Sequence, residues 1–345
     1  MKAMRKFAPT GGVVLPVNKA ARPVRGALRT LLGNQGSVRR PIAFLVLAAS
    51  VSCLISPEFH GLPNIRVLLT NSSFLVVLAA GEALVILVGG IDLGVESVLA
   101  ASGMFVASLF VLHSVPSGLS MLITLALGAA VGALAGLMVS KVRVPSFIVT
   151  LGTYWGFRGI ALLFNGGNYI SPDAVHPVRP FGFAWIAGNL GRFPVLVIVT
   201  LLVVVAGQIL LSFTPLGTRI KATGSSEEAA RAVGVRTAWI KILVFALSGF
   251  CAALAGIMIT AWQNSIYPLT GEGYSLQAIA GVILGGIPFS GGRGSLAGAA
   301  VGALVIGVIN DVIVLIGLPA HYEYIFVAVV LVLAGLQTRG GPFVK

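Results

Sequence analysis

The chain has 345 residues, of which 57% are hydrophobic and 10% are charged. Soluble domains carry about 25% charged residues, so this composition excludes an ordinary soluble fold. Residues 194–211 contain no charged residue, and about 20 apolar residues suffice for a helix to cross a bilayer. These unbroken apolar blocks predict an all-α membrane protein with many spans, because a membrane β-barrel would show alternating segments of about 10 residues.

Residues 1–40 hold nine Lys and Arg residues and no acidic residue. They predict a basic, disordered arm that lies on anionic lipid at the cytoplasmic surface, where each basic residue contributes about 1 kcal/mol. An organelle transit peptide is the alternative, because such peptides are also rich in Arg and poor in acids. Nucleic-acid binding is not expected, since the net charge of +13 follows largely from the membrane topology.

Ten apolar segments are predicted to be transmembrane helices, and residues 41–338 are predicted to form one transmembrane domain. The segments are 41–57, 67–88, 97–113, 119–140, 145–164, 194–213, 241–262, 274–289, 296–317 and 322–338. Cys53 and Cys251 fall inside these segments and are expected to be packing residues. The four histidines are scattered, so we expect no metal site.

The distribution of basic residues predicts the orientation of the chain. If the N-terminus is cytoplasmic, the cytoplasmic loops hold 19 of the 23 Lys and Arg residues. Cytoplasmic loops of membrane proteins carry such an excess. Both termini, including the tail at 339–345, and the loop at 214–240 are therefore predicted to face the cytoplasm.

Small residues suggest how the helices pack. Glycines recur every four residues in two predicted spans, and this spacing allows helices to approach closely in a bilayer. The stretch GAAVGAL occurs at 128–134 and again at 298–304, five spans apart and therefore in opposite directions. This echo suggests an inverted repeat, a pattern common among transporters.

The loop at 214–240 contains a compact polar helix signal. Ser225 and Glu228 have the spacing of a capping box, Glu227 adds a second acid to the first turn, and Gly234 is the expected stop. We predict a helix at 226–233 that presents a small alanine face, with Arg231 at its rim, to a groove in a partner. Ala229, Ala230 and Ala232 are strong helix formers, and Ala230→Arg is expected to abolish uptake while the protein still inserts normally. A plain connector is the alternative, but it would need only about 2–8 residues.

The chain lacks a means of using ATP itself. A phosphate-binding loop of the G-x-x-x-x-G-K-[ST] type needs a Gly-Lys pair, and the sequence contains none. We therefore expect no cofactor in this chain and no enzymatic activity of its own. If transport is driven by ATP, a separate subunit must use ATP and Mg²⁺ and act on the predicted helix.

These motifs resemble a known family. EAARAVG at 228–234 resembles the EAA loop of ABC-importer permeases, and GGIDLGVES at 89–97 resembles the signature of their ribose/xylose/arabinose branch. Further similar stretches are VPSFIVTLGT, GYSLQAIAGVILGG and GGRGS, and the resemblance runs from about 64 to 338. Gly94 and Glu96 depart from that signature, so a substrate inferred from the branch is in doubt.

The resemblance implies an architecture and partners. A permease of this kind has about ten helices in the vitamin-B12-type (type II) importer fold and lies in the bacterial inner membrane. It pairs with a second copy or a paralogue, docks a cytoplasmic ABC ATPase, and receives solute from a periplasmic solute-binding protein. The implied substrate is a sugar or sugar-like solute, although no particular solute is indicated.

Several polar residues within the predicted spans are candidates for the translocation pathway or gate. A charge at the bilayer centre costs roughly 2.5–3.5 kcal/mol, so such residues usually face a cavity or a partner. Arg158 is expected to lie near a helix end and to extend its charge to the membrane surface. The pathway or gate candidates are Asn71, Ser72, Glu82, Gly89, Gly90, Asp92 and Glu96.

Two other functions are weighed against import driven by ATP. An ion-coupled secondary transporter is the alternative, but the intramembrane acids and bases form no evident proton relay. A membrane enzyme is not expected, because no Ser/His/Asp set or acidic cluster is evident. The dependence of uptake on ATP or on a proton gradient separates the two transport mechanisms.

Overall fold

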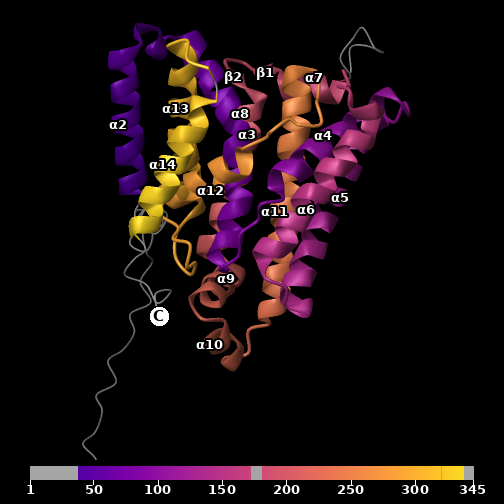
Figure 1. The fold of residues 1–345 in the computed structure, drawn as a ribbon, viewed down its shortest axis with the longest axis vertical. Coiled ribbons are helices and arrows are strands. Elements are labelled where there is room, and N and C mark those ends of the chain that lie inside the picture. The colour runs from indigo at the N-terminus through magenta and orange to yellow at the C-terminus, as the bar shows by residue number, and fades with distance from the viewer. Residues whose placement is uncertain (1–37, 172–180, 320, 338–345) are drawn as a thin grey trace, which may run out of the picture.

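The computed structural model describes residues 38–171, 181–319 and 321–337. Most of the predicted basic arm (1–40) and the tail at 339–345 therefore lie outside the described residues, and what we expect of them stays a prediction. In the described part, tall helices run side by side along the long axis of the molecule (Figure 1).

Each of the ten predicted spans overlaps one helix. The helices are α2 (Arg39–Ile55), α3 (Leu62–Leu87), α4 (Val95–Val111), α5 (Ser117–Leu137), α6 (Ser146–Leu163), α8 (Val195–Phe213), α11 (Thr237–Gln263), α12 (Tyr274–Leu284), α13 (Leu296–Leu315) and α14 (Tyr322–Gln337). Within the described ranges, six helices are long and apolar enough to cross a membrane, namely α3, α5 with its extension, α6, α8, α11 and α13. The described part of the chain is thus mostly helical with several candidate spans, consistent with the predicted polytopic membrane protein.

Shorter elements connect these helices. They are the 3-10 turns η1 (Pro57–His60) and η3 (Phe164–Gly167), the π-helical turn η2 (Met138–Val142), α7 (Phe181–Ala187), α9 (Pro215–Ser225), α10 (Glu227–Ala232), β1 (Asn189–Leu190) and β2 (Phe193–Pro194). The two short strands pair antiparallel, with Leu190 opposite Phe193. Helix α7 inserts Phe183, which is 1% exposed, beside α11.

The core is built around α3 and α11. The apolar window of α3 is 89% buried, whereas that of α6 is 17% buried. A helix that is apolar on every side belongs either in a protein core or against lipid, and these two helices represent the two cases. Helix α3 is therefore the central element, while α6 presents a largely unpacked apolar surface.

Glycines let α5 lie directly on α11, as their spacing predicts. An added Cβ at Gly132 would lie 2.0 Å from the Phe245 carbonyl oxygen. Similarly, a Cβ at Gly302 of α13 would lie 2.0 Å from the Gly281 carbonyl oxygen of α12. Any larger residue at these positions would push the helices apart.

The packing relates two groups of four helices, α3–α6 and α11–α14. Helix α5 packs on α11, and correspondingly α13 packs on α3. Helix α4 contacts α6 and α11, and its counterpart α12 contacts α14 and α3. The two GAAVGAL stretches lie in the third helix of each group. This correspondence supports the internal repeat that the two stretches suggest.

Candidate functional site

A break between α3 and α4 passes through the interior at residues 88–94, which we call the α3–α4 break. Gly89 has φ +79, a conformation that other residues rarely adopt. The Asp92 carboxylate holds the break, because it accepts hydrogen bonds from the Gly94 amide at 3.0 Å and from the Ser248 hydroxyl of α11 at 2.9 Å. Asp92 is therefore engaged within the chain, with 6% of its surface exposed.

Glu82 lies against the same break from within α3. It is 0% exposed, and its Oε1 accepts from the Asp92 amide at 3.1 Å. Its other oxygen, Oε2, has no hydrogen-bond partner in the described part of the chain. The candidate pathway residue Glu82 and the candidate gate residue Asp92 thus lie together, and both support the course of the broken backbone.

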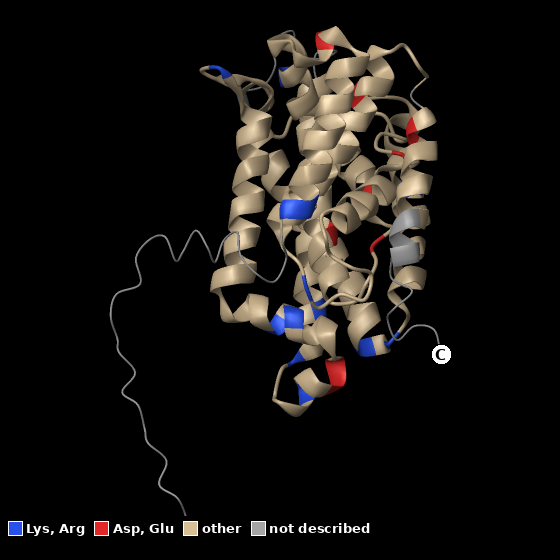
Figure 2. Ribbon diagram, turned by 90° about the vertical axis from the view of Figure 1, so that its left-hand side faces the viewer, with Lys and Arg blue, Asp and Glu red and all other residues tan. Residues whose placement is uncertain are grey.

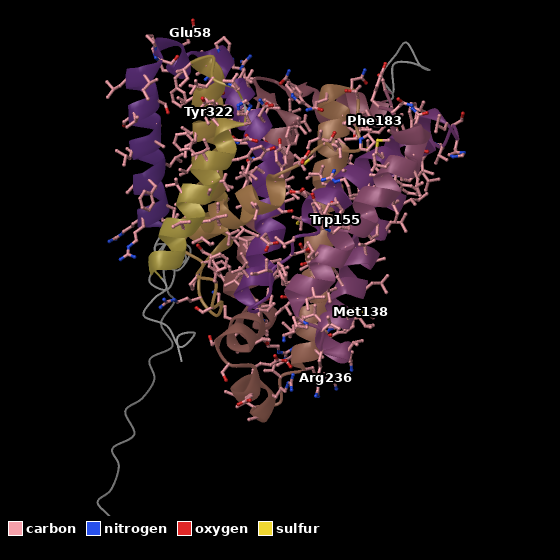
Figure 3. The ribbon with its side chains drawn as sticks, in the orientation of Figure 1. Glu58, Met138, Trp155, Phe183, Arg236 and Tyr322 are labelled. Atoms are coloured by element: carbon pink, nitrogen blue, oxygen red, sulfur yellow. The ribbon has the colours of Figure 1, made fainter. Side chains whose placement is uncertain are left out.

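Glu82→Gln is expected to change the turnover of transport and leave the apparent affinity for solute unchanged. The amide oxygen of Gln can still accept from the Asp92 amide, but the carboxyl group beside the break is lost, and Glu82 does not face the surface. Uptake kinetics at varied solute concentration measure both quantities. Glu58→Gln is the control, because Glu58 is exposed at the far end of the molecule (Figure 3). Unchanged kinetics would assign Glu82 to packing alone.

The second group of buried charges joins α4, α6 and α12. Arg158 Nη2 lies 3.2 Å from Glu96 Oε1, and Arg158 Nη1 donates to the Pro268 carbonyl at 2.7 Å. The Ser275 amide at the start of α12 donates to Glu96 Oε2 at 3.0 Å, and the Ser275 hydroxyl donates to the Leu93 carbonyl at 2.9 Å. The α3–α4 break therefore meets the start of α12 in the interior, and Arg158 of α6 contacts the α11–α12 connection (residues 264–273).

The prediction that Arg158 extends to the membrane surface is wrong. Arg158 is 5% exposed, and it pairs with a carboxylate inside the bundle. The departure at Glu96 is explained by the same contact, since this carboxylate binds Arg158 and the first turn of α12. The role of Glu96 seen in the structure is to join three helices.

Asn71 and Ser72 lie elsewhere. Asn71 is exposed, and Ser72 is buried against α13, where a Cβ on Gly307 would lie 2.1 Å from its hydroxyl oxygen. Ser72 precedes Glu82 by ten residues, which is about 15 Å along a helix. The structure therefore does not bring this polar pair together with Gly89, Gly90 and Asp92.

The loop at 214–240 contains two helices, α9 and α10, and only the second was predicted. The residue that caps α10 is Ser226, whose hydroxyl accepts from the Ala229 amide at 3.2 Å. The predicted capping box of Ser225 and Glu228 is wrong, because Ser225 ends α9 and its hydroxyl donates to the Lys221 carbonyl. Gly234 does end the helix, with φ +85.

The outward face of α10 also differs from the prediction. Ala230 is 3% exposed and faces the rest of the chain, so it is not available to a partner in this structure. Ala229, Ala232 and Val233 are exposed, Val233 by 79%. The exposed apolar face of α10 is therefore formed by these three residues, and Ala230→Arg would disturb the packing of α10 itself.

Glu227 fastens α10 to α11. Its carboxylate accepts from Lys241 Nζ at 2.6 Å, from the Thr237 hydroxyl at 3.1 Å, and from Arg231. Burial raises the pKa of Glu227, but the hydrogen bonds from Lys241 and Arg231 lower that pKa more, so it lies below its ordinary value. Glu227 and Arg231, both predicted to act at the docking element, thus fix its position.

Glu227→Gln is expected to loosen α10. The amide cannot keep the charge-assisted bonds to Lys241 and Arg231, and a loss of about 1 kcal/mol would speed local opening roughly fivefold. Amide hydrogen exchange of residues 229–233 measures that opening. Glu228→Gln is the matched control, because Glu228 is the adjacent acid and is exposed. Equal exchange in both variants would contradict the role of Glu227.

A cavity of about 450 Å³ borders α10 and the α3–α4 break. It lies at the end of the molecule where Figure 3 labels Met138 and Arg236. Its lining combines hydroxyl, basic and backbone groups with a few apolar residues, and it includes Gly89, Gly90, Ser140, Arg143, Ser146, Glu227, Arg231 and Lys241. The cavity therefore lies between the gate candidates Gly89 and Gly90 and helix α10.

Sequence reasoning missed the hydroxyl groups that hold the break. The Ile91 amide donates to Ser146 Oγ at 3.3 Å, and the Thr150 hydroxyl lies 3.2 Å from the Ile91 carbonyl oxygen. Ser248 was also missed. Each is a hydroxyl within an apolar segment, a signal too common to assign a role without the contact.

The amino-acid sequence matches known transport proteins over most of its length. Residues 64–335 match the family described as branched-chain amino acid transport system / permease component. The chain is 40% identical over 295 residues to the ribose import permease protein RbsC of Escherichia coli (strain K12), which covers 86% of this chain and 91% of the relative. No solved structure matches the chain.

Less similar relatives are also permease proteins of transport systems. The D-allose transport system permease protein AlsC of Escherichia coli (strain K12) is 35% identical over 285 residues, covering 82% of this chain and 86% of the relative. The autoinducer 2 import system permease protein LsrC of Photorhabdus laumondii is 33% identical over 299 residues, covering 85% and 86%. With its apolar helices, the chain is a multi-pass inner-membrane protein, and it belongs to the family of ABC-importer permease components.

Proposed function

We propose that the chain is the membrane-spanning subunit of an importer that is driven by ATP and carries a sugar or sugar-like solute into the cytoplasm. The observation that carries the proposal is the similarity to the ribose import permease over 86% of the chain. The names of the relatives favour a sugar over a branched-chain amino acid, although the family description mentions the latter. The proposal names no particular sugar, because Gly94 and Glu96 depart from the signature of the ribose/xylose/arabinose branch.

The proposed topology has ten spans with both termini in the cytoplasm and a vitamin-B12-type fold. Figure 2 shows lysine and arginine gathered at the end where α9 and α10 lie. Basic residues concentrate on the cytoplasmic side of membrane proteins, which supports placing α10 there. The corresponding contacts of α3–α6 and α11–α14 support two repeats. In the proposed topology the two groups are five spans apart and therefore run in opposite directions.

The proposed partners act at opposite ends. A cytoplasmic ABC ATPase, which uses ATP and Mg²⁺, docks on the exposed face of α10, and a periplasmic solute-binding protein delivers the solute at the other end. This permease chain has no phosphate-binding Gly-Lys pair. The exposed apolar Val233 beside charged residues has the composition expected of a small docking helix.

A second copy, or a paralogue, is proposed to cover α6. This helix exposes Gly152, Gly156 and Gly159, around which an added Cβ would meet no other atom. An apolar groove of about 370 Å³ runs between α5 and α6. Small residues of this kind suit close helix contacts in a bilayer. The solute path is then formed between two copies, with α6 as part of its wall.

One observation favours the alternative of an ion-coupled transporter. Two buried carboxylates, Glu82 and Asp92, lie at a broken helix, which is where secondary transporters bind ions. The test is uptake of radiolabelled ribose into vesicles that contain the permease, its ATPase and its solute-binding protein. We expect uptake that needs ATP, stops with vanadate and survives a protonophore, whereas the reverse pattern would establish the alternative.

The choice of solute is tested separately. Titration calorimetry of the solute-binding protein against a panel of pentoses, hexoses and branched-chain amino acids is expected to show binding of a sugar. Binding of the amino acids alone would overturn the proposed substrate class and leave the proposed mechanism standing.

A further inference from the structure

Three backbone segments meet without side chains between them at the end of α3. The Gly292 amide, in the loop before α13, donates to the Leu87 carbonyl at 3.0 Å. A Cβ added to Gly224, at the end of α9, would lie 1.8 Å from that same carbonyl oxygen. A Cβ added to Gly292 would lie 2.5 Å from the hydroxyl oxygen of Ser225. We call this meeting point the glycine junction (Leu87, Gly224, Ser225 and Gly292).

The glycine junction has little room for independent movement. Protein interiors are close-packed, so a shift of one segment displaces its neighbour. Here Gly224 meets the Leu87 and Gly292 backbone directly, and the short Ser225 hydroxyl is the one side-chain group among the four residues' contacts, so little can absorb the shift. A displacement of α9 would therefore be passed to Leu87, which directly precedes the α3–α4 break.

The middle of the break is tied to α6. The Ile91 amide donates to Ser146 Oγ, and the Thr150 hydroxyl is shared between the Ile91 carbonyl oxygen at 3.2 Å and the Ser146 carbonyl oxygen at 2.9 Å. Thr150 is 0% exposed, so its bond is shielded from water, whereas Ser146 is half-buried and lines the cavity. The break is thus held by the glycine junction just before it and by two hydroxyl groups of α6 at its middle residue, Ile91.

We propose that Gly224, Ser146 and Thr150 are positioning residues that carry movement of the α9–α10 loop through the α3–α4 break to α6. This inference rests on the proposed function, since it assumes that an ATPase moves α10 and that α6 lines the path. A competing route would pass from Glu227 and Lys241 directly into α11. The hydroxyl groups of α6 lie only on the first route, and their removal distinguishes the two.

The deciding experiment removes both hydroxyl groups with Ser146→Ala/Thr150→Val in the assembled complex. The matched control is Ser120→Ala/Thr124→Val in α5, which has the same spacing but bonds only to carbonyls of residues 115, 116 and 120. Two quantities are measured in vesicles: ATP hydrolysis stimulated by the loaded solute-binding protein, and ribose taken up per ATP hydrolysed. Co-purification of the ATPase confirms assembly.

We expect the α6 variant to assemble and to hydrolyse ATP like the wild type. Ribose taken up per ATP should fall roughly twofold to thirtyfold, the range of mutational effects on coupling between sites, while the α5 control keeps the wild-type ratio. Thr150→Ser, which keeps the hydroxyl, should restore most of the ratio. An unchanged ratio, or an equal fall in the α5 control, would overturn the route.

Gly224→Ala tests the other end of the route. The added methyl group must move the Leu87 carbonyl, and we expect the same fall in ribose per ATP. Gly118→Ala is its control, because a Cβ at Gly118 meets no other atom. If Gly224→Ala keeps the wild-type ratio of ribose taken up per ATP, the glycine junction is not part of the route. Absence of ATP-dependent uptake of any sugar that the solute-binding protein binds would overturn the proposed function together with the route, whereas wild-type uptake with unaffected variants would overturn the route alone.

Discussion

Arg158→Met is expected to destabilise the protein by about 3–5 kcal/mol, because it leaves a buried carboxylate without its partner. Glu96 would keep the hydrogen bond from the Ser275 amide but would lose the guanidinium, and the Pro268 carbonyl would also lose its donor. The expected result is a large fall in the thermal unfolding midpoint of the detergent-solubilised protein and in its yield as a single species.

The double variant Arg158→Met/Glu96→Gln separates loss of charge balance from loss of packing. The amide oxygen of the introduced glutamine can still accept from the Ser275 amide, and removal of both members of a buried ion pair is often nearly neutral. We therefore expect the double variant to recover most of the midpoint lost by Arg158→Met. Arg66→Met, at an exposed position, serves as the control. If both single and double variants unfold alike, the ion pair is not the cause.

Val233→Asp is expected to remove the ATPase from the complex while the permease still inserts. Burial of a valine at an interface contributes about 1.5–3 kcal/mol. A carboxylate at that place must also lose water, so we expect binding at least about 100-fold weaker. Titration of the purified ATPase against the solubilised permease measures the affinity, and vesicle uptake should disappear in parallel.

The control for this variant is Val142→Asp. Val142 is also exposed, at 56%, and ends the π-helical turn after α5 beside Lys141. It lies outside α10, so the same new charge should leave ATPase binding within about twofold of wild type. Equal loss in both variants would mean that added charge, and not the α10 face, weakens docking.

The long apolar helices were accessible from sequence because hydrophobic length alone predicts them. The start of α11 was missed by four residues, since the segment was expected only from Lys241, whereas the helix begins at Thr237 and uses Lys241 to bind Glu227. Helix α9 was missed because Arg219 and Lys221 make its sequence resemble a loop. Its amphipathic pattern can be recognised as a helix only once the helices on which its apolar face packs are known.

The site was harder to predict than the fold because it depends on register and on distant partners. Either of two adjacent serines could cap α10, and the choice of Ser226 turned Ala230 inward. Arg158 pairs with the carboxylate of Glu96, which lies 62 residues earlier in the chain. The sequence signalled that the intramembrane charges needed partners, but it did not show which ones they have.

The spacing of that ion pair has a consequence for how the protein is made. The ribosome adds about 5–20 residues each second, so Glu96 emerges roughly 3–12 seconds before Arg158. During this interval the carboxylate cannot be neutralised by its later partner, and full entry of α4 into lipid would be costly. We therefore expect helix α4 to stay beside water or the insertion machinery until α6 has been synthesised, and the two helices to enter the bilayer together.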